Sequence, residues 1–116
     1  MMLGQIANII VRRPIPVLYD LPRLELTFDE NDGNDIVFSR FMGLAVALEV
    51  HNTSTSTDLV YSINSKSHRR ITIAPESFKG YDRTQITSVH IHSGDSWLIR
   101  AQVVLFEDIL RALGGR

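Results

Sequence analysis

Two histidines, His90 and His92, stand two positions apart in a stretch of alternating apolar and polar residues. In a β-strand this spacing places both side chains on one face, where two neutral imidazoles can share a metal ion. A zinc site needs three or four ligands, and the only other histidines, His51 and His68, are distant in sequence. We therefore expect no metal or other cofactor, and name His90 and His92 as the candidate ligands if a metal binds. Alternatively, both are solvent-facing residues of a strand.

Residues 29–35 form an acidic segment that is rich in the oxygen ligands preferred by calcium. Its spacing does not match the helix–loop–helix calcium motif, because aligning Gly33 with the motif's glycine puts Phe28 at the first ligand position. Asn, Asp and Gly are also the residues that a turn between strands requires. The composition favours a turn over a calcium site.

Other groups that could do chemistry are incomplete. The only basic cluster consists of Lys66, His68, Arg69 and Arg70, and it lacks the aromatic residues of a single-strand nucleic-acid site. Residues 93–96 contain two serines and an aspartate without the flanking glycines of a nucleophile elbow. The chain has no cysteine, and its net charge of -1 gives no electrostatic footprint for nucleic acid or an anionic membrane. We expect a protein that is not an enzyme and binds neither.

Short runs of alternating apolar and polar residues begin at Arg23 and are separated by polar breaks or by breaks with glycine or proline. This alternation is typical of half-buried β-strands. It predicts strands at residues 24–28, 36–39, 43–51, 59–63, 71–73, 89–92 and 97–104. About seven strands joined by short turns indicate an all-β fold, an antiparallel β-sandwich with jelly-roll or immunoglobulin-like topology.

The alternation also predicts which side chains enter the core. The two longest strands contribute Leu44, Val46, Leu48 and Val50, and Trp97, Ile99, Ala101 and Val103. Residues 79–84 are polar and are predicted to form a loop, and residues 93–96 a hairpin connection.

The two ends of the chain do not follow the alternation. Residues 1–22 begin with an apolar stretch and continue through a proline-containing linker, which favours an extended arm before the sandwich domain of residues 23–105. Such an arm needs another surface to cover it, unless it is a first strand of the same sandwich. Its apolar stretch is too short to span a membrane and lacks the cleavage site of a signal peptide.

Residues 106–116 have the charge order of a short helix followed by a tail. Glu107 and Asp108 come early, Arg111 comes near the end, and Gly114 follows. Acidic residues stabilise the first turn of a helix and basic residues the last, and glycine commonly ends it. We expect a short C-terminal helix over residues 106–113.

The strand cadence resembles that of small β-sandwich proteins in tailed-phage particles, which include capsid decoration or cement proteins and head or tail accessory proteins. The resemblance is carried by residues 50–54, 60–64, 71–77 and 97–102 and covers about half of the chain. Proteins of that family sit on a virion surface as symmetric homo-oligomers, often trimers, whose terminal arms bridge neighbouring subunits.

For this chain the resemblance implies a non-enzymatic virion structural protein that binds copies of itself and a major capsid or other virion protein. It implies no catalytic residues and no cofactor. The residues expected to contact partners are Leu3, Ile6, Ile9, Ile10, Pro14 and Pro16 in the arm, and Phe106, Ile109 and Leu110 in the helix.

Two alternatives remain open. A glycan- or receptor-binding module would use the loops at residues 52–58 and 79–84, with Tyr81 as the loop aromatic available for stacking on a sugar. A cupin-like metal-binding protein would use His90 and His92 as ligands.

Overall fold

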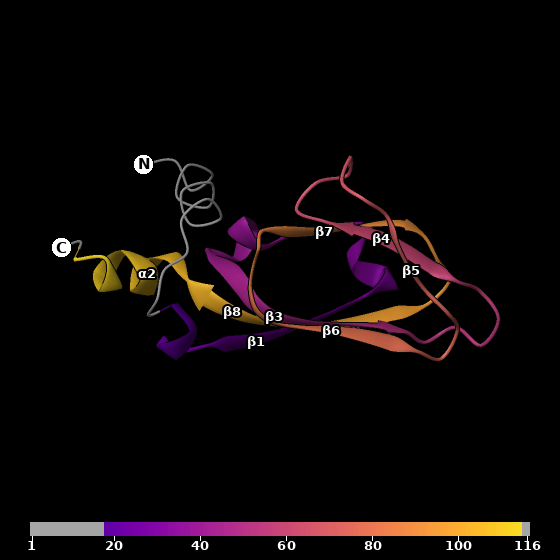
Figure 1. Cartoon of the computed structure of the whole chain (residues 1–116), viewed down its shortest axis with the longest axis horizontal. Coiled ribbons are helices and arrows are strands. Elements are labelled where there is room, and N and C mark those ends of the chain that lie inside the picture. The colour runs from indigo at the N-terminus through magenta and orange to yellow at the C-terminus, as the bar shows by residue number, and fades with distance from the viewer. Residues whose placement is uncertain (1–17, 115–116) are drawn as a thin grey trace.

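The computed structural model describes residues 18–114 and arranges them as two four-stranded antiparallel sheets that face each other (Figure 1). Sheet A contains, in spatial order, β1 (Leu24–Asp29), β8 (Trp97–Leu105), β3 (Gly43–Asn52) and β6 (Phe78–Ile86). Sheet B contains β2 (Asp35–Val37), β7 (Ser88–Ser93), β4 (Leu59–Ile63) and β5 (Ile71–Ile73). The predicted all-β sandwich is confirmed.

The strand order identifies the topology as a jelly roll. Strands from opposite ends of the chain lie side by side, β1 beside β8 and β2 beside β7. Only β4 and β5 are consecutive strands within one sheet, and every other connection between the described strands crosses to the opposite sheet. Eight strands in two sheets fit a jelly roll, whereas immunoglobulin-like domains have seven or nine.

Two predicted connections are wrong. Residues 93–96 do not close a hairpin, because they carry the chain from β7 in sheet B to β8 in sheet A. Residues 79–84 are not a loop, because they belong to β6. Strand β6 lies at the edge of sheet A, and its side chains are mostly exposed. Edge strands commonly carry charged residues, so the apolar alternation that marks a central strand is missing here.

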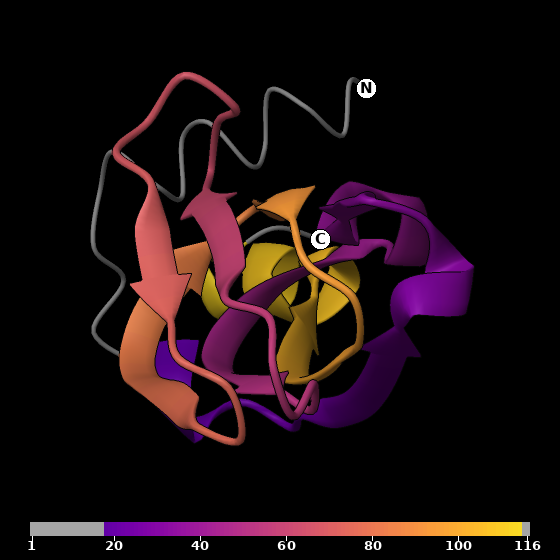
Figure 2. The same ribbon diagram turned by 90° about the vertical axis from the view of Figure 1, so that its right-hand side faces the viewer.

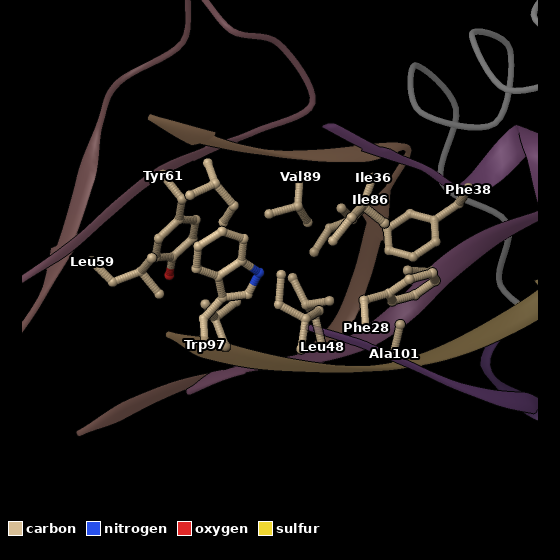
Figure 3. Packing of buried hydrophobic residues seen from close by; sticks show 14 of the residues in the cluster. Phe28, Ile36, Phe38, Leu48, Leu59, Tyr61, Ile86, Val89, Trp97 and Ala101 are labelled. Carbon is tan, nitrogen blue, oxygen red and sulfur yellow. The ribbon is translucent and has the colours of Figure 1, made fainter. Parts of the chain in front are cut away.

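The main core fills the space between the sheets, where aromatic and aliphatic side chains from both layers point toward one another (Figure 3). The predicted inward residues of β8 are confirmed, since Trp97, Ile99, Ala101 and Val103 are all buried in this cluster. Burial of apolar surface on this scale is the principal stabilising contribution in a chain without disulfides.

Strand β3 changes face at a β-bulge directly after Ala45, where its register against both neighbours shifts. A bulge inserts one residue and so moves the following side chains to the opposite face. Ala45, Leu48 and Val50 therefore belong to the main core, whereas Leu44 and Val46 lie on the outer face of sheet A. The prediction of one continuous face is wrong for Leu44 and Val46.

A second cluster covers part of the outer face of sheet A. It contains Leu18, Leu44, Val46, Val104, Phe106 and Ile109, all buried. Leu18 comes from the 3-10 helix η1 (Leu18–Asp20), and Phe106 and Ile109 come from α2 (Phe106–Ala112), which confirms the predicted C-terminal helix. The remaining 3-10 turns are η2 (Glu30–Asp32) and η3 (Phe38–Phe41). In the end view of Figure 2, α2 lies behind the strands, at the far end of the sandwich.

The predicted arm falls mostly on residues outside the described range, including Leu3, Ile6, Ile9, Ile10, Pro14 and Pro16. The described end of the predicted linker packs on the chain's own sandwich through Leu18, which is fully buried. Among residues 18–114, no helix has the length and apolar character that crossing a membrane requires.

Candidate functional site

The part of the outer face of sheet A that η1 and α2 leave open contains a polar groove of about 490 Å³. Cross-strand pairing arranges most of its lining residues in two rows, which are Gly80, Glu49 and Arg100, then Asp82, Ala47, Gln102 and Glu25. Ala47 and Gly80 contribute almost no side-chain volume, so the groove runs between the longer charged side chains. This volume is within the range of small-ligand sites.

The charged groups of the groove differ in how many partners they have among residues 18–114. Arg23 donates to the side-chain oxygen of Gln102 over 2.6 Å and to the carbonyl oxygen of Tyr19 over 3.1 Å. Arg100 lies directly across the strands from Glu49 but takes part in none of the salt bridges found among residues 18–114. The guanidinium of Arg100 is therefore available to a ligand.

An exposed aromatic pair lies beside the groove on the same face of the sheet. Phe78 is 62% exposed and is paired across the strands with His51, and the two rings stack with centroids 4.9 Å apart and planes inclined by 17°. His51 Nε2 lies 2.9 Å from Glu49 Oε1, which fixes the orientation of the imidazole. The stacked pair presents a flat apolar surface next to charged groups.

On the outer face of sheet B, Ser88, His90 and Asp35 form a connected chain of polar contacts. The distances are 2.8 Å from Ser88 Oγ to His90 Nε2 and 2.8 Å from His90 Nδ1 to Asp35 Oδ1. Lys66 Nζ lies 3.1 Å from the second Asp35 oxygen. Hydrogen bonds with His90 and Lys66 hold the pKa of Asp35 below its ordinary value.

This chain of contacts has the connectivity of a serine–histidine–aspartate triad. Ser88, however, is only 6% exposed, so its hydroxyl is shielded from an incoming substrate. It also lies on a strand, without the strand-to-helix turn that presents a nucleophile in hydrolases. The contacts with Ser88 and with Asp35 of β2 hold the His90 ring in one position. The Ser88 and His90 spacing is visible in the sequence, but Asp35 comes from a strand more than fifty residues away.

The two candidate metal ligands have separate partners. His92 Nε2 lies 2.9 Å from the Oγ of the buried Ser62, while His90 contacts Ser88 and Asp35. Burial and the nearby Arg70 lower the pKa of His92. No group of three His, Cys, Asp or Glu side chains that could hold a metal ion occurs within the described range.

The acidic segment at residues 29–35 supplies turn contacts. Asp29 accepts a hydrogen bond from the Asn31 amide over 2.9 Å, and the Asp32 carboxylate accepts one from the Asp29 amide over 2.8 Å. This reciprocal pair is a capping box at the start of η2. Both carboxylates therefore satisfy backbone donors of the turn that the sequence predicts.

The residues proposed for a loop-based glycan site have other roles in the structure. Tyr81 is in β6, packs against the main core, and places its hydroxyl 2.6 Å from that of the buried Tyr61. Its prediction as a loop aromatic is wrong. In the 52–58 loop, the Asn52 amide donates to the carbonyl oxygens of Thr57 and Ile73, so this side chain holds the loop in place.

The residues of the basic cluster have different partners. Lys66 pairs with Asp35, and His68 Nδ1 lies 2.8 Å from the carbonyl oxygen of Ile63. Arg69 is exposed at the surface. Two of the four basic side chains of the cluster therefore have partners among residues 18–114.

Exposed large apolar side chains gather at the α2 end of the sandwich. Six are exposed within residues 18–114, and four of these lie at this end: Leu24, Met42, Leu110 and Leu113. Strands β1 and β3 begin here and β8 ends here (Figure 1), and the Phe106 amide donates to the Met42 carbonyl over 2.7 Å.

The three helix residues expected to bind partners differ in exposure. Phe106 and Ile109 are buried in the second cluster, so they stabilise the chain's own fold and are not available at its surface. Leu110 is 36% exposed. Partner binding through this helix therefore stays a prediction for Leu110.

The sequence reasoning missed the groove residues on sheet A. Glu49 and Arg100 were predictable only as outward-facing strand positions. Asp82 was not predictable even as that, because residues 79–84 were predicted to form a loop. In comparisons with known proteins, no family, no curated protein and no solved structure matched this chain.

Proposed function

We propose that this protein is a non-enzymatic virion structural protein that decorates or cements a phage capsid, or serves as a head or tail accessory, through contacts with other subunits. The observation that carries the proposal is that four of the six large apolar side chains exposed among residues 18–114 lie at the α2 end. Clustered apolar surface at one end of a small domain is typical of a protein–protein interface.

Two further features support the proposal. The cadence of the strands resembles that of small phage sandwich proteins, and the jelly-roll topology is one that viral capsid domains use, although lectins and cupins use it as well. The cupin alternative has less support, because His90 and His92 face outward from sheet B and have other partners.

Light scattering coupled to size-exclusion chromatography tests the contact surface. We expect a homo-oligomer, a trimer if the resemblance holds, that dissociates in the double variant Met42→Asp, Leu113→Asp. Met42 has a left-handed backbone conformation that aspartate tolerates, so this variant should fold. The control is Phe78→Asp, an equally exposed apolar residue on the open face of sheet A, which should leave the oligomer intact.

The role of the arm and the presence of the protein in phage particles need separate experiments. Deletion of residues 2–13 should weaken association if Leu3, Ile6, Ile9 and Ile10 bridge subunits. Mass spectrometry of purified particles from the source should find the protein in fixed ratio to the major shell protein. The proposal would be contradicted if the protein were a monomer, if the deletion left its stability unchanged, and if it were absent from particles.

A further inference from the structure

The open half of the outer face of sheet A combines three features that stability does not require. It has a groove of about 490 Å³, two charged side chains, Glu25 and Arg100, without a hydrogen-bond or salt-bridge partner among residues 18–114, and an exposed aromatic ring. On a sheet face with no such role, isolated charges surrounded by solvent would suffice. The combination indicates a site for a ligand.

The charges of the groove indicate the chemistry of that ligand. Two guanidiniums, Arg23 and Arg100, are interleaved with three carboxylates, Glu25, Glu49 and Asp82. A phosphate or a nucleic acid would be repelled by the carboxylates, and a cation by the guanidiniums. Guanidiniums only donate hydrogen bonds and carboxylates only accept them. A ligand that offers donors and acceptors together, such as the neighbouring hydroxyls of a sugar, matches this alternation.

The aromatic pair supplies the apolar contact that sugars also need. One face of a pyranose ring carries C–H groups that pack on an aromatic side chain. Phe78 lies two residues from Gly80 on the same face of β6, and the Phe78 ring is held parallel to that of His51. The Glu49 carboxylate contacts His51, so the stacking surface and the polar groove are directly connected.

The position of the groove argues against a peptide strand as the occupant. An extended peptide adds to the edge of a sheet, where backbone donors and acceptors are unpaired. The groove crosses the face of sheet A instead, over strands whose backbones are paired with each other.

We propose that the open face of sheet A binds a neutral oligosaccharide, with Phe78 as the stacking residue and Arg100, Glu49 and Asp82 as the hydrogen-bonding residues. The stacking residue Phe78 pairs with His51 near the far end of β3 from Met42, so the site adds a binding activity to the proposed structural role and does not depend on it. Gly80 has no atom within 4 Å of where a Cβ would lie, so a larger residue there can fill the groove without disturbing the fold.

A glycan array probed with the full chain tests the proposal. The array carries neutral oligosaccharides, sialylated oligosaccharides and bacterial surface polysaccharides. Calorimetry then measures the affinity for the neutral glycan that binds best. We expect binding to a neutral glycan that weakens about tenfold or more in Phe78→Ala and in Arg100→Ala. Gly80→Val should also weaken it by obstructing the groove. Thermal unfolding of each variant should match that of the parent.

The matched control is the double variant Met42→Asp, Leu113→Asp, which should keep the parent affinity in calorimetry even if it alters the oligomer. Three results would overturn the proposal: no neutral glycan bound, binding restricted to acidic glycans, or binding unchanged in Phe78→Ala and Arg100→Ala. Because Phe78→Asp should not change the oligomer, failure of this site and failure of the structural role are distinguishable.

Discussion

The outer faces of the two sheets both carry polar side chains, but these side chains have different partners. On sheet B, Ser88, His90 and Asp35 are connected to one another, and Lys66 adds a second contact to the same carboxylate. On the open part of sheet A, Arg100 has no salt-bridge partner among residues 18–114. The bonded groups of sheet B hold its strands together, whereas the guanidinium of Arg100 is free to bind a ligand.

Sheet A itself is divided by the bulge in β3. On the α2 side of the bulge the outer face is apolar and covered, and on the other side it is charged and open. The outer face of sheet B, the covered part of sheet A and the open part of sheet A are therefore three different regions. Substitutions in them should change stability and binding to different extents.

The largest effect is expected in the covered region. Leu44→Ala removes a fully buried side chain between sheet A and the helices that cover it, and should lower the free energy of unfolding by about 2–5 kcal/mol. Urea denaturation measures this change. Leu24→Ala, at an exposed position on the same sheet, is the control and should cost less than about 1 kcal/mol. Equal losses in the two variants would mean that the second cluster is not a true core.

Two glycines of sheet A provide the next comparison. A Cβ at Gly43 would overlap the Val103 side chain and lie 2.8 Å from the Val104 carbonyl oxygen, so Gly43→Ala should destabilise the protein by about 1–3 kcal/mol. At Gly80 a Cβ would meet no atom within 4 Å, and Gly80→Ala should be neutral or stabilising by about 0.5 kcal/mol. Urea denaturation measures both changes in the free energy of unfolding. If Gly80→Ala destabilised the protein more than Gly43→Ala, the covered region would be loosely packed.

Alternation in the sequence predicted the sandwich, seven of the eight described strands, and the inward side chains of β8, because these depend on local apolar periodicity. It did not predict β6, whose edge position removes the need for an apolar face. It also failed at the bulge, since an inserted residue in β3 leaves the pattern of apolar residues unchanged while reversing the face of Leu44 and Val46.

The candidate surfaces were less predictable than the fold. The groove depends on Glu49, Arg100 and Asp82 becoming neighbours across three strands, and only the strand order 1-8-3-6 determines that. The pairing of His90 with Asp35 likewise depends on β2 lying beside β7. Both follow from jelly-roll topology, which periodicity alone could not distinguish from the immunoglobulin-like alternative.

Two titratable side chains on the outer face of sheet B, His92 and Asp35, should make stability depend on pH. The pKa of His92 is lowered in the folded state, so the unfolded state binds more protons once the pH falls below the ordinary value of 6.5, and stability declines. The pKa of Asp35 is also lowered, which adds a second decline below 3.8. We expect the melting temperature to fall in both windows. His92→Gln should flatten the first decline and Asp35→Asn the second.

The smallest effect on stability is expected for the open charges of sheet A. Arg100→Gln removes an exposed charge that has no salt-bridge partner within the described range, so it should change the free energy of unfolding by less than about 0.5 kcal/mol. Added salt should alter that difference little, because Arg100 forms no salt bridge among residues 18–114 whose attraction salt would screen. Paired urea denaturation at low and high salt measures both quantities. A salt-sensitive loss as large as that of Gly43→Ala would show that Arg100 stabilises the sheet, and the distinction between the two outer faces would then be lost.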